Sequence, residues 1–417
     1  MRKLFYWAFA FSLCVLMGCK DDGVRVEVVR YAINEPVFMS ISEFRNSVKV
    51  TDEVVPITKR GKICFYKDYL YISSPDKGIH IVDNRNPASP RIVGFVELIG
   101  NEDLSIKDDK LYADSYVDLV WFDISDPERP ELEGRVENAF RYALPTIENG
   151  YGFDYNMCYS EEARAKGVVV GWEPKETIYH YPSYGGDLMA NDAAPGTSTQ
   201  GVNGSMARFS IYGKYLYTVE QNIMCVFDLS GDKPVLTTND IWLQRDVETL
   251  FNYKDKMFMG TPTGMLIYSL EDPLAPKYRS SVSHVFGCDP VVVEDDLAYV
   301  TVHSGNTCGQ NTNELMLIDV SDVDQPNLLV TYGMKCPKGL GIDNGTLFLC
   351  DEGLKVFNAK DPMTLLANQL VHYAGMEGYD VIPFRNTLMM IADDGLYQYD
   401  YSNLQAISQL SKLPMGE

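Results

Sequence analysis

The chain has 417 residues, of which 46% are hydrophobic, and a formal net charge of −22. This length and apolar content suffice to bury a large folded core. Because the chain is strongly negative, it repels phosphate backbones and anionic membrane surfaces, and we expect no nucleic-acid partner. The negative charge is compatible with binding of divalent cations or basic partners. The alternative is that it only keeps the protein soluble.

The N-terminus has the pattern of an export signal. Arg2 and Lys3 precede an apolar run from Leu4 to Met17, which is too short to span a bilayer, and Gly18-Cys19 follows. This pattern predicts a signal peptide over residues 1–18. The Gly-Cys pair resembles the lipobox of bacterial lipoproteins, which implies cleavage before Cys19 and lipids on that cysteine. The alternative is an ordinary signal with a chance cysteine.

Lys20-Asp21-Asp22 follows at once. It resembles the acidic export signal of Bacteroidetes lipoproteins, which implies display on the outer face of the outer membrane. The alternative is a solvated tether. In either case, the lipid anchor is the only membrane contact that we expect.

Residues 19–58 are expected to form the lipidated tether and an N-terminal segment that packs on the domain after it. Val24, Val26 and Val28 alternate with charged residues, which predicts a strand. Ser40, with Glu43 three residues later, has the spacing of a helix capping box.

A unit recurs seven times between residues 59 and 417. Its clearest copy is Gly78-Ile79-His80-Ile81-Val82-Asp83, followed by a tail that ends in proline. Most copies are about 40 residues apart, the spacing of four-stranded propeller blades. The seven marker positions that end the apolar run are Asp83, Asp123, Asp228, Ser269, Asp319, Asn358 and Asp400.

Each unit predicts four strands. An Asp side chain at the marker can accept hydrogen bonds from backbone amides just downstream. These bonds favour a turn, so the strand and its hydrogen-bond ladder end there. The proline that ends the tail favours an edge strand. A second apolar piece, such as Tyr69–Ile72 after the turn at Lys67-Asp68, precedes each marker. We predict an all-β, seven-bladed β-propeller of four-stranded blades, against a β-sandwich or an open stack of sheets. The last unit has its own outer strand near residues 406–410, so an N-terminal closing strand is possible but not required.

The Gly-Ile-His-Ile-Val-Asp run with its Asp/Ser/Pro tail resembles the LVIVD repeat of bacterial surface and secreted proteins. The resemblance covers most of the mature chain. It implies a propeller fold, mostly without an assigned activity.

One gap between markers, from Asp123 to Asp228, is far longer than the others and predicts an insertion over about residues 138–207. Val168–Trp172 within it reads as a strand, and Trp172 and several tyrosines could stack on sugar rings. Long structureless loops are usually functional or disordered. A second long loop, residues 303–313, should lie on the same face, which becomes the candidate binding face.

Cysteines in the fifth unit allow several interpretations. We favour a disulfide between Cys288 and Cys308, because an exported protein meets oxidising conditions. Cys336 is a competing partner, and free thiols are the next alternative. His284 and His303 could complete a zinc site with the two cysteines, but the spacing is not that of a zinc knuckle.

Polar residues begin the predicted inner strands, so they should surround the mouth of the central channel. Their carboxylates could hold Ca²⁺ or contact a polar or sugar ligand. The alternative is that channel mouths are wet and polar in any case. The candidate ligand-binding residues are Glu102, Asp103, Arg208, Asp246, Glu248, Asp289, Lys338, Glu377 and Asp380, with Trp172 from the insertion.

No catalytic motif is evident. The chain has only five histidines, no Gly-x-Ser-x-Gly elbow and no phosphate-binding loop or dinucleotide fingerprint. We therefore expect a lipid-anchored surface propeller that binds a protein or a glycan without catalysis and without a cofactor. The alternative is a polysaccharide hydrolase or lyase that uses the mouth carboxylates. A purely structural role in an envelope complex is also compatible with the sequence.

Overall fold

The computed structural model describes residues 25–416, apart from residue 60 and residues 184–206, 284–289 and 304–311. The predicted lipidation site Cys19, the predicted disulfide partners Cys288 and Cys308, and Asp289 lie outside the described residues. Within the described ranges, no helix is long and apolar enough to cross a membrane.

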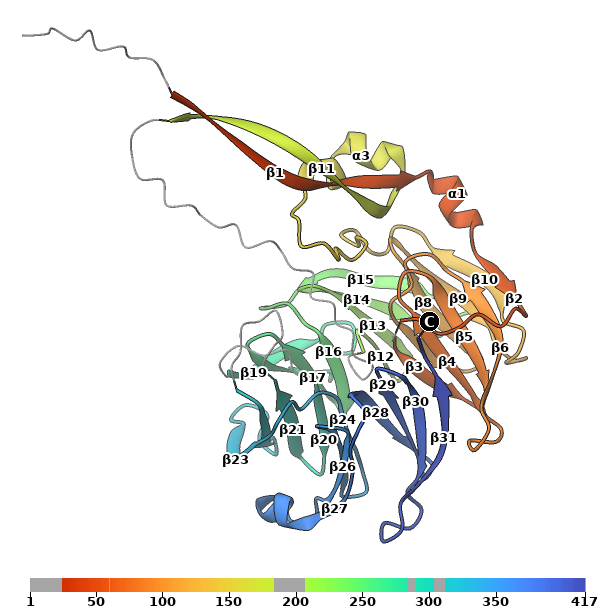
Figure 1. Cartoon of the computed structure of the whole chain (residues 1–417), viewed down its shortest axis with the longest axis vertical. Helices are drawn as coiled ribbons and strands as arrows, with labels where there is room; N and C mark the ends of the chain where they lie inside the picture. Colours follow the sequence, from red (N-terminus) through yellow and green to blue (C-terminus); the bar gives the residue numbers. More distant parts are fainter. Residues whose placement is uncertain (1–24, 60, 184–206, 284–289, 304–311, 417) are drawn as a thin grey trace, which may run out of the picture.

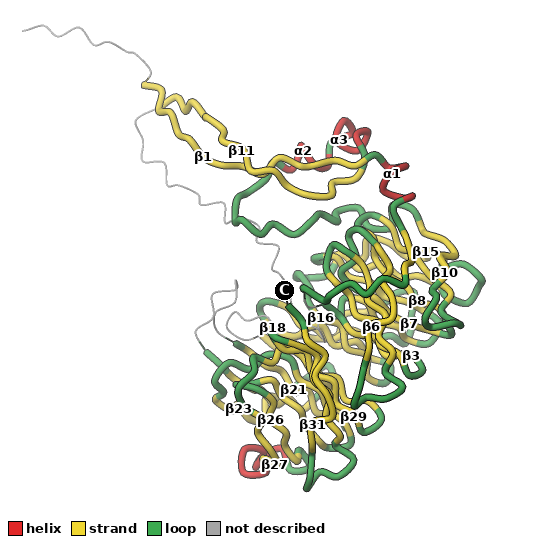
Figure 2. Tube along the Cα trace, turned by 45° about the vertical axis from the view of Figure 1, so that its right-hand side comes forward, coloured by secondary structure: helices red, strands yellow, loops and turns green. Residues whose placement is uncertain are grey.

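Seven antiparallel blades form a β-propeller, as predicted (Figures 1 and 2). In each blade, four consecutive strands run from the channel outward. Blades one to four consist of β3 (Ile63–Tyr66), β4 (Tyr69–Ser74), β5 (Gly78–Asp83) and β6 (Arg91–Glu97); β7 (Leu104–Lys107), β8 (Lys110–Ser115), β9 (Asp118–Asp123) and β10 (Glu131–Val136); β12 (Phe209–Tyr212), β13 (Tyr215–Glu220), β14 (Ile223–Asp228) and β15 (Val235–Trp242); and β16 (Thr249–Tyr253), β17 (Lys256–Thr261), β18 (Gly264–Ser269) and β19 (Lys277–Ser283).

The last three blades follow the same order. They consist of β20 (Val291–Glu294), β21 (Leu297–Val302), β22 (Glu314–Asp319) and β23 (Asn327–Gly333); β24 (Leu340–Asp343), β25 (Thr346–Cys350), β26 (Leu354–Asn358) and β27 (Gln369–Tyr373), with a 3₁₀ segment at Pro362–Asn368; and β28 (Gly378–Phe384), β29 (Thr387–Ala392), β30 (Gly395–Asp400) and β31 (Ser408–Pro414).

The predicted marker turn is present in all seven blades. Each marker side chain accepts a hydrogen bond from the backbone N–H two residues later; for Asp123 the donor is Ser125 at 2.7 Å, and for Asn358 it is Lys360 at 3.2 Å. The same bond is made by Asp83, Asp228, Ser269, Asp319 and Asp400. The side chain and backbone N–H of Ser125 lower the pKa of Asp123. In five blades the outer strand begins directly after the predicted proline, and in blades two to five this strand is an edge strand, as predicted.

Neighbouring blades pack face to face through one apolar cluster per junction. Ile79 and Ile81 of blade one, for example, share a cluster with Val120 and Phe122 of blade two, all of them fully buried. A hydroxyl group beside the cluster then donates to the carbonyl of the first proline in the next blade's marker tail. Four such bonds, of 2.6–2.8 Å, are Tyr71 to Pro127, Tyr217 to Pro273, Tyr332 to Pro362 and Ser411 to Pro87.

The ring closes between blades seven and one without exchange of strands. Each of the two blades is complete from its own segment, and β2 (Lys49–Thr51) only adds a fifth strand outside β6. The buried amides of Asn84 and Gln398 donate to each other's oxygens across the junction, at 3.1 and 2.8 Å. The N–H of Gly416 donates to the carbonyl of Ile57 at 2.9 Å. The N-terminal segment therefore reinforces the junction from outside and does not supply a closing strand.

A two-stranded ribbon extends from the propeller (Figures 1 and 2). It pairs β1 (Arg25–Met39), which contains most of the predicted N-terminal strand, with β11 (Val168–Ser183) in antiparallel register. The chain between blades two and three also forms α2 (Tyr155–Tyr159) and α3 (Glu161–Lys166). After β1, the predicted capping box starts α1 (Ile41–Asn46), with the N–H of Glu43 donating to Ser40 Oγ at 3.3 Å.

The marker turn can be tested at Asp123. Asp123→Ala should lower the free energy of unfolding by about 1 kcal/mol, because the Ser125 N–H loses its acceptor. Asp123→Asn should retain most of the stability, since Asn358 makes the same turn in blade six. Chemical denaturation of both variants measures the difference. Equal losses for Ala and Asn would contradict an acceptor role.

The free energy of unfolding should depend on pH because of His80 in the first blade. This side chain is fully buried in β5 with its ring 4.7 Å from that of Phe95, and burial lowers its pKa from 6.5 to about 4. The unfolded chain therefore binds a proton that the folded chain excludes. The stability that comes from the neutral His80 is fully present above pH 6.5 and is lost as the pH falls towards 4. Over this range the free energy of unfolding changes by at most about 1.4 kcal/mol per pH unit through this group.

His80→Leu should flatten the dependence of the free energy of unfolding on pH in this window. The exposed His372→Leu is the matched control and should keep the wild-type slope. Denaturant titrations across the window decide the matter, and identical slopes for wild type and His80→Leu would refute the assignment.

Candidate functional site

The predicted polar residues gather at one end of the channel, which we call the mouth. There the chain passes from the outer strand of one blade to the inner strand of the next. The guanidinium of Arg208 forms an ion pair with the carboxylate of Glu102. Asp103 accepts a hydrogen bond from the N–H of Phe209 at 3.1 Å and lies 3.3 Å from Lys62 Nζ. Blades one, two and three are thus joined at the mouth by groups of opposite charge.

A second pair joins blades six and seven. Lys338, nearly buried, forms an ion pair with Glu377, and its ammonium lies 3.9 Å from the centroid of the Tyr379 ring. Its backbone carbonyl accepts a hydrogen bond from the hydroxyl of Thr301 at 2.6 Å. Asp380, also predicted, is buried beside this group.

The other predicted residues have different surroundings. Asp246 is exposed and Glu248 is half-buried, both just before β16. Trp172 lies in β11, where its Nε1 donates to the carbonyl of Pro145 at 2.8 Å and its ring packs 5.1 Å from that of Phe153. The tryptophan therefore holds the insertion segments together through both its ring and its N–H.

The structure adds two carboxyl groups that the sequence reasoning missed. Asp114 is the last residue but one of β8, and its Oδ1 accepts hydrogen bonds from the N–H groups of Glu102 and Asp103 at 2.7 and 3.0 Å. Glu220 ends β13 and accepts from the N–H of Tyr142 at 3.4 Å. Both residues come just after the apolar part of the second strand of their unit, at the end of the blade where the mouth lies. An acidic residue at this repeated position is the signal that could have revealed them.

The environment of these two acids favours their neutral forms. Burial raises the pKa of Asp114 to about 8, and the charge of Glu102 adds to this effect. Burial likewise raises the pKa of Glu220 to about 7. The positive charge of Arg208 lowers the pKa of both acids, but Arg208 also forms an ion pair with Glu102. Two protonatable groups therefore titrate near neutral pH at the mouth.

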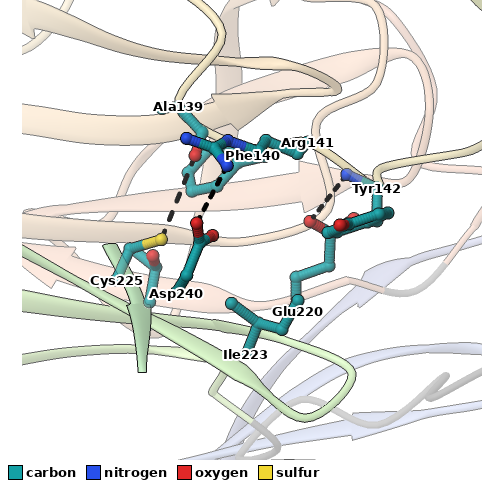
Figure 3. A pocket seen from close by; sticks show the side chains of 9 residues that line it. Ala139, Phe140, Arg141, Tyr142, Glu220, Ile223, Cys225 and Asp240 are labelled. Carbon is teal, nitrogen blue, oxygen red and sulfur yellow. Dashed lines mark hydrogen bonds and ion pairs between the residues drawn. The ribbon is translucent and has the colours of Figure 1, made fainter. Parts of the chain in front are cut away.

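Residues 139–153 cover this part of the mouth. In Figure 3, Arg141 forms an ion pair of 2.9 Å with Asp240, and the N–H of Tyr142 meets Glu220. The pocket between them has a volume of ≈ 10 Å³, enough for about one water molecule. The cover is fixed to β1 by buried Asn34, whose amide nitrogen donates to Asn149 Oδ1 and to the carbonyl of Tyr151 at 2.9 and 2.8 Å.

The described part of the chain contains some of the possible metal ligands and cysteines. It contains no group of three or more His, Cys, Asp or Glu side chains placed to hold a metal ion. Its cysteines are free thiols, including Cys336, and burial raises the pKa of Cys225 to about 11, so that thiol is protonated at neutral pH.

Comparison with known proteins supports the repeat and the fold. The LVIVD repeat family matches residues 61–97, 102–138 and 289–333, which contain blades one, two and five. No curated protein matches the chain.

Solved propellers of several kinds are similar to the chain. A putative 6-phosphogluconolactonase from Bacteroides fragilis is 10% identical, with 86% of this chain and 94% of that chain covered and a TM-score of 0.51. The periplasmic gluconolactonase of Pseudomonas aeruginosa is 11% identical, with 88% and 97% covered and a TM-score of 0.50. At such identity these similarities show the fold alone.

The neutral form of Asp114 leads to a prediction. The folded chain keeps a proton on this carboxyl up to about pH 8, whereas the unfolded chain releases it near 3.8, so stability declines as the pH rises between these values. Asp114→Asn keeps an acceptor at Oδ1 and cannot ionise. The stability of the variant relative to wild type should therefore rise between about pH 4 and about pH 8.

The control for this measurement is the exposed Asp232→Asn, whose stability relative to wild type should not vary with pH. Denaturant titrations at both pH values suffice. A constant difference between wild type and Asp114→Asn would show that Asp114 is already ionised in the folded chain.

Proposed function

We propose that this chain is a lipid-anchored propeller of the bacterial outer membrane, displayed at the cell surface, that binds a protein or glycan partner without catalysis. The observation that carries the binding role is the cover over the mouth. Residues 139–153 close over mutually paired charges, while Tyr151, Tyr155 and Met157 point to solvent. Exposed aromatic and thioether groups beside a rigid platform are suited to contact with a macromolecule.

The anchor rests on the sequence pattern that ends in Gly18-Cys19 and on the acidic residues after it. The ribbon supports this arrangement, because β1 begins at Arg25, a few residues from the proposed lipid. Fifteen residues of strand at about 3.3 Å each form a spacer of roughly 50 Å if extended. Such a spacer would keep the propeller away from the bilayer and leave its covered mouth accessible.

Cys19→Ser should abolish labelling with a radioactive fatty acid in a lipoprotein-producing host and release the protein from the membrane fraction. Cys14→Ser, inside the same apolar run, is the control and should be labelled normally. Protease treatment of intact cells should digest the wild-type protein. Labelling of Cys19→Ser, or full protection from protease in intact cells, would contradict the anchor or the surface location respectively.

The binding role is tested by cross-linking and pull-down from the host envelope. The triple variant Tyr151→Ala, Tyr155→Ala, Met157→Ala should lose the captured partner. Leu328→Ala with Leu329→Ala, which changes exposed apolar residues on blade five, should retain it. Capture that is equal with both variants would exclude the exposed side chains of residues 151–157, at the end of the cover and in α2, as the docking surface.

One observation favours polysaccharide cleavage as a second candidate. Glu220, with its pKa raised to about 7, is poised for general acid or base catalysis if the cover opens. Glu220→Gln should then abolish turnover on a broad glycan panel while the fold is retained. Absence of turnover by the wild-type protein would remove this candidate.

A further inference from the structure

A second pocket lies on the face of the propeller opposite the mouth, where the ring closes. Its walls come from the turns after the inner strands of blades one and seven and from the marker tail of blade one. Its volume is ≈ 130 Å³. A buried apolar cavity of similar size holds a ligand as large as benzene, so this pocket has room for a small organic molecule and not merely for water.

The inner wall of this pocket is apolar. The rings of Phe65 and Phe384 meet across the junction with their centroids 4.4 Å apart, and buried Met389 lies beside them. These three side chains come from the first and last blades. A ligand that covers them therefore contacts both ends of the ring at once.

Two opposite charges at the rim are not paired. Arg385 lies with its guanidinium 4.9 Å from the centroid of the Phe384 ring, and Asp68 lines the same pocket. Within the described ranges, no carboxylate forms an ion pair with Arg385 and no cation forms one with Asp68, and the two do not pair with each other. They are therefore more than 4.0 Å apart, the limit for an ion pair.

The other arginine of the pocket shows the contrast. Arg85 donates to both carboxylate oxygens of Asp83, at 2.9 and 2.7 Å, and also pairs with Glu128 at 3.2 Å. Its charge is compensated, and its position is fixed by the marker turn. Among the described residues, no carboxylate lies within ion-pair distance of Arg385, which is unexpected for an arginine on a chain of net charge −22.

We propose that this pocket binds a free α-amino acid with an apolar side chain. The planar guanidinium of Arg385 suits a carboxylate, which it can hold through two parallel hydrogen bonds. Asp68 receives the ammonium group. The side chain of the ligand covers Phe65, Phe384 and Met389, where its apolar surface leaves water. The site is independent of the lipid anchor and of the cover on the opposite face.

Isothermal titration of the purified full chain with L-leucine tests the site. Two analogues serve as probes of the charges: 4-methylpentanoate lacks the ammonium group, and 3-methylbutylamine lacks the carboxylate. Leucine should bind. Each analogue should bind at least about tenfold more weakly than leucine, because one rim charge loses its partner.

Matched variants separate the two rim charges. Arg385→Gln and Asp68→Asn should each weaken leucine binding about tenfold, and Asp68→Asn should leave binding of 4-methylpentanoate unchanged. The exposed Arg164→Gln and Asp232→Asn are controls and should bind leucine within about twofold of wild type. Leucine should also raise the melting temperature, since it bridges the first and last blades.

Two results would overturn the proposal. One is the absence of both binding heat and a melting shift with leucine, methionine and phenylalanine at about 10 mM. The other is leucine binding that survives in both Arg385→Gln and Asp68→Asn. Because the rim residues are exposed, each variant should fold, and its melting curve without ligand verifies that it does.

Discussion

The turn that ends the third strand of every blade is the interaction on which the rest of the ring depends. A marker side chain accepts the N–H two residues ahead, so the chain leaves the ladder at a fixed point. In four blades, the proline loop that follows then presents a carbonyl to the previous blade, as Pro127 does to Tyr71. One local hydrogen bond thus sets the end of the third strand in every blade, and in most blades the loop behind it leads into the outer strand or contacts the neighbouring blade.

The mouth follows from this regular frame and from a surplus of acids. Blade geometry brings the first residues of the inner strands together, where Arg208 and Lys338 pair with Glu102 and Glu377. Where burial outweighs the effect of the nearby cation, it favours the protonated form, as for Asp114 beside Arg208. The ends of the channel differ as a result. At the mouth, charges are paired and residues 139–153 cover the part beside blades two and three, whereas the pocket at the ring closure keeps two rim charges apart.

The repeated features were predictable because they are local. The marker residues, the prolines and the capping box at Ser40 act within a few residues of the chain, so spacing alone revealed them. The gathering of Glu102, Asp103 and Arg208 followed from the blade count. The cover was not predictable, because Asn34 fixes residues 149–152 from a strand more than a hundred residues away. The role of Trp172 in packing also depends on a partner, Phe153, that no periodicity indicates.

The central claim is that the mouth is closed by the protein's own charges. A high-resolution crystal structure of residues 20–417, grown without chelators, tests it most directly through the electron density at the mouth. The account predicts that the Arg208–Glu102 and Lys338–Glu377 pairs are intact and that only ordered water lies beside Asp114 and Glu220. A metal ion or a trapped ligand bound by the carboxylates of Glu102, Asp114 and Glu220 would contradict it and would make the mouth a binding or catalytic site.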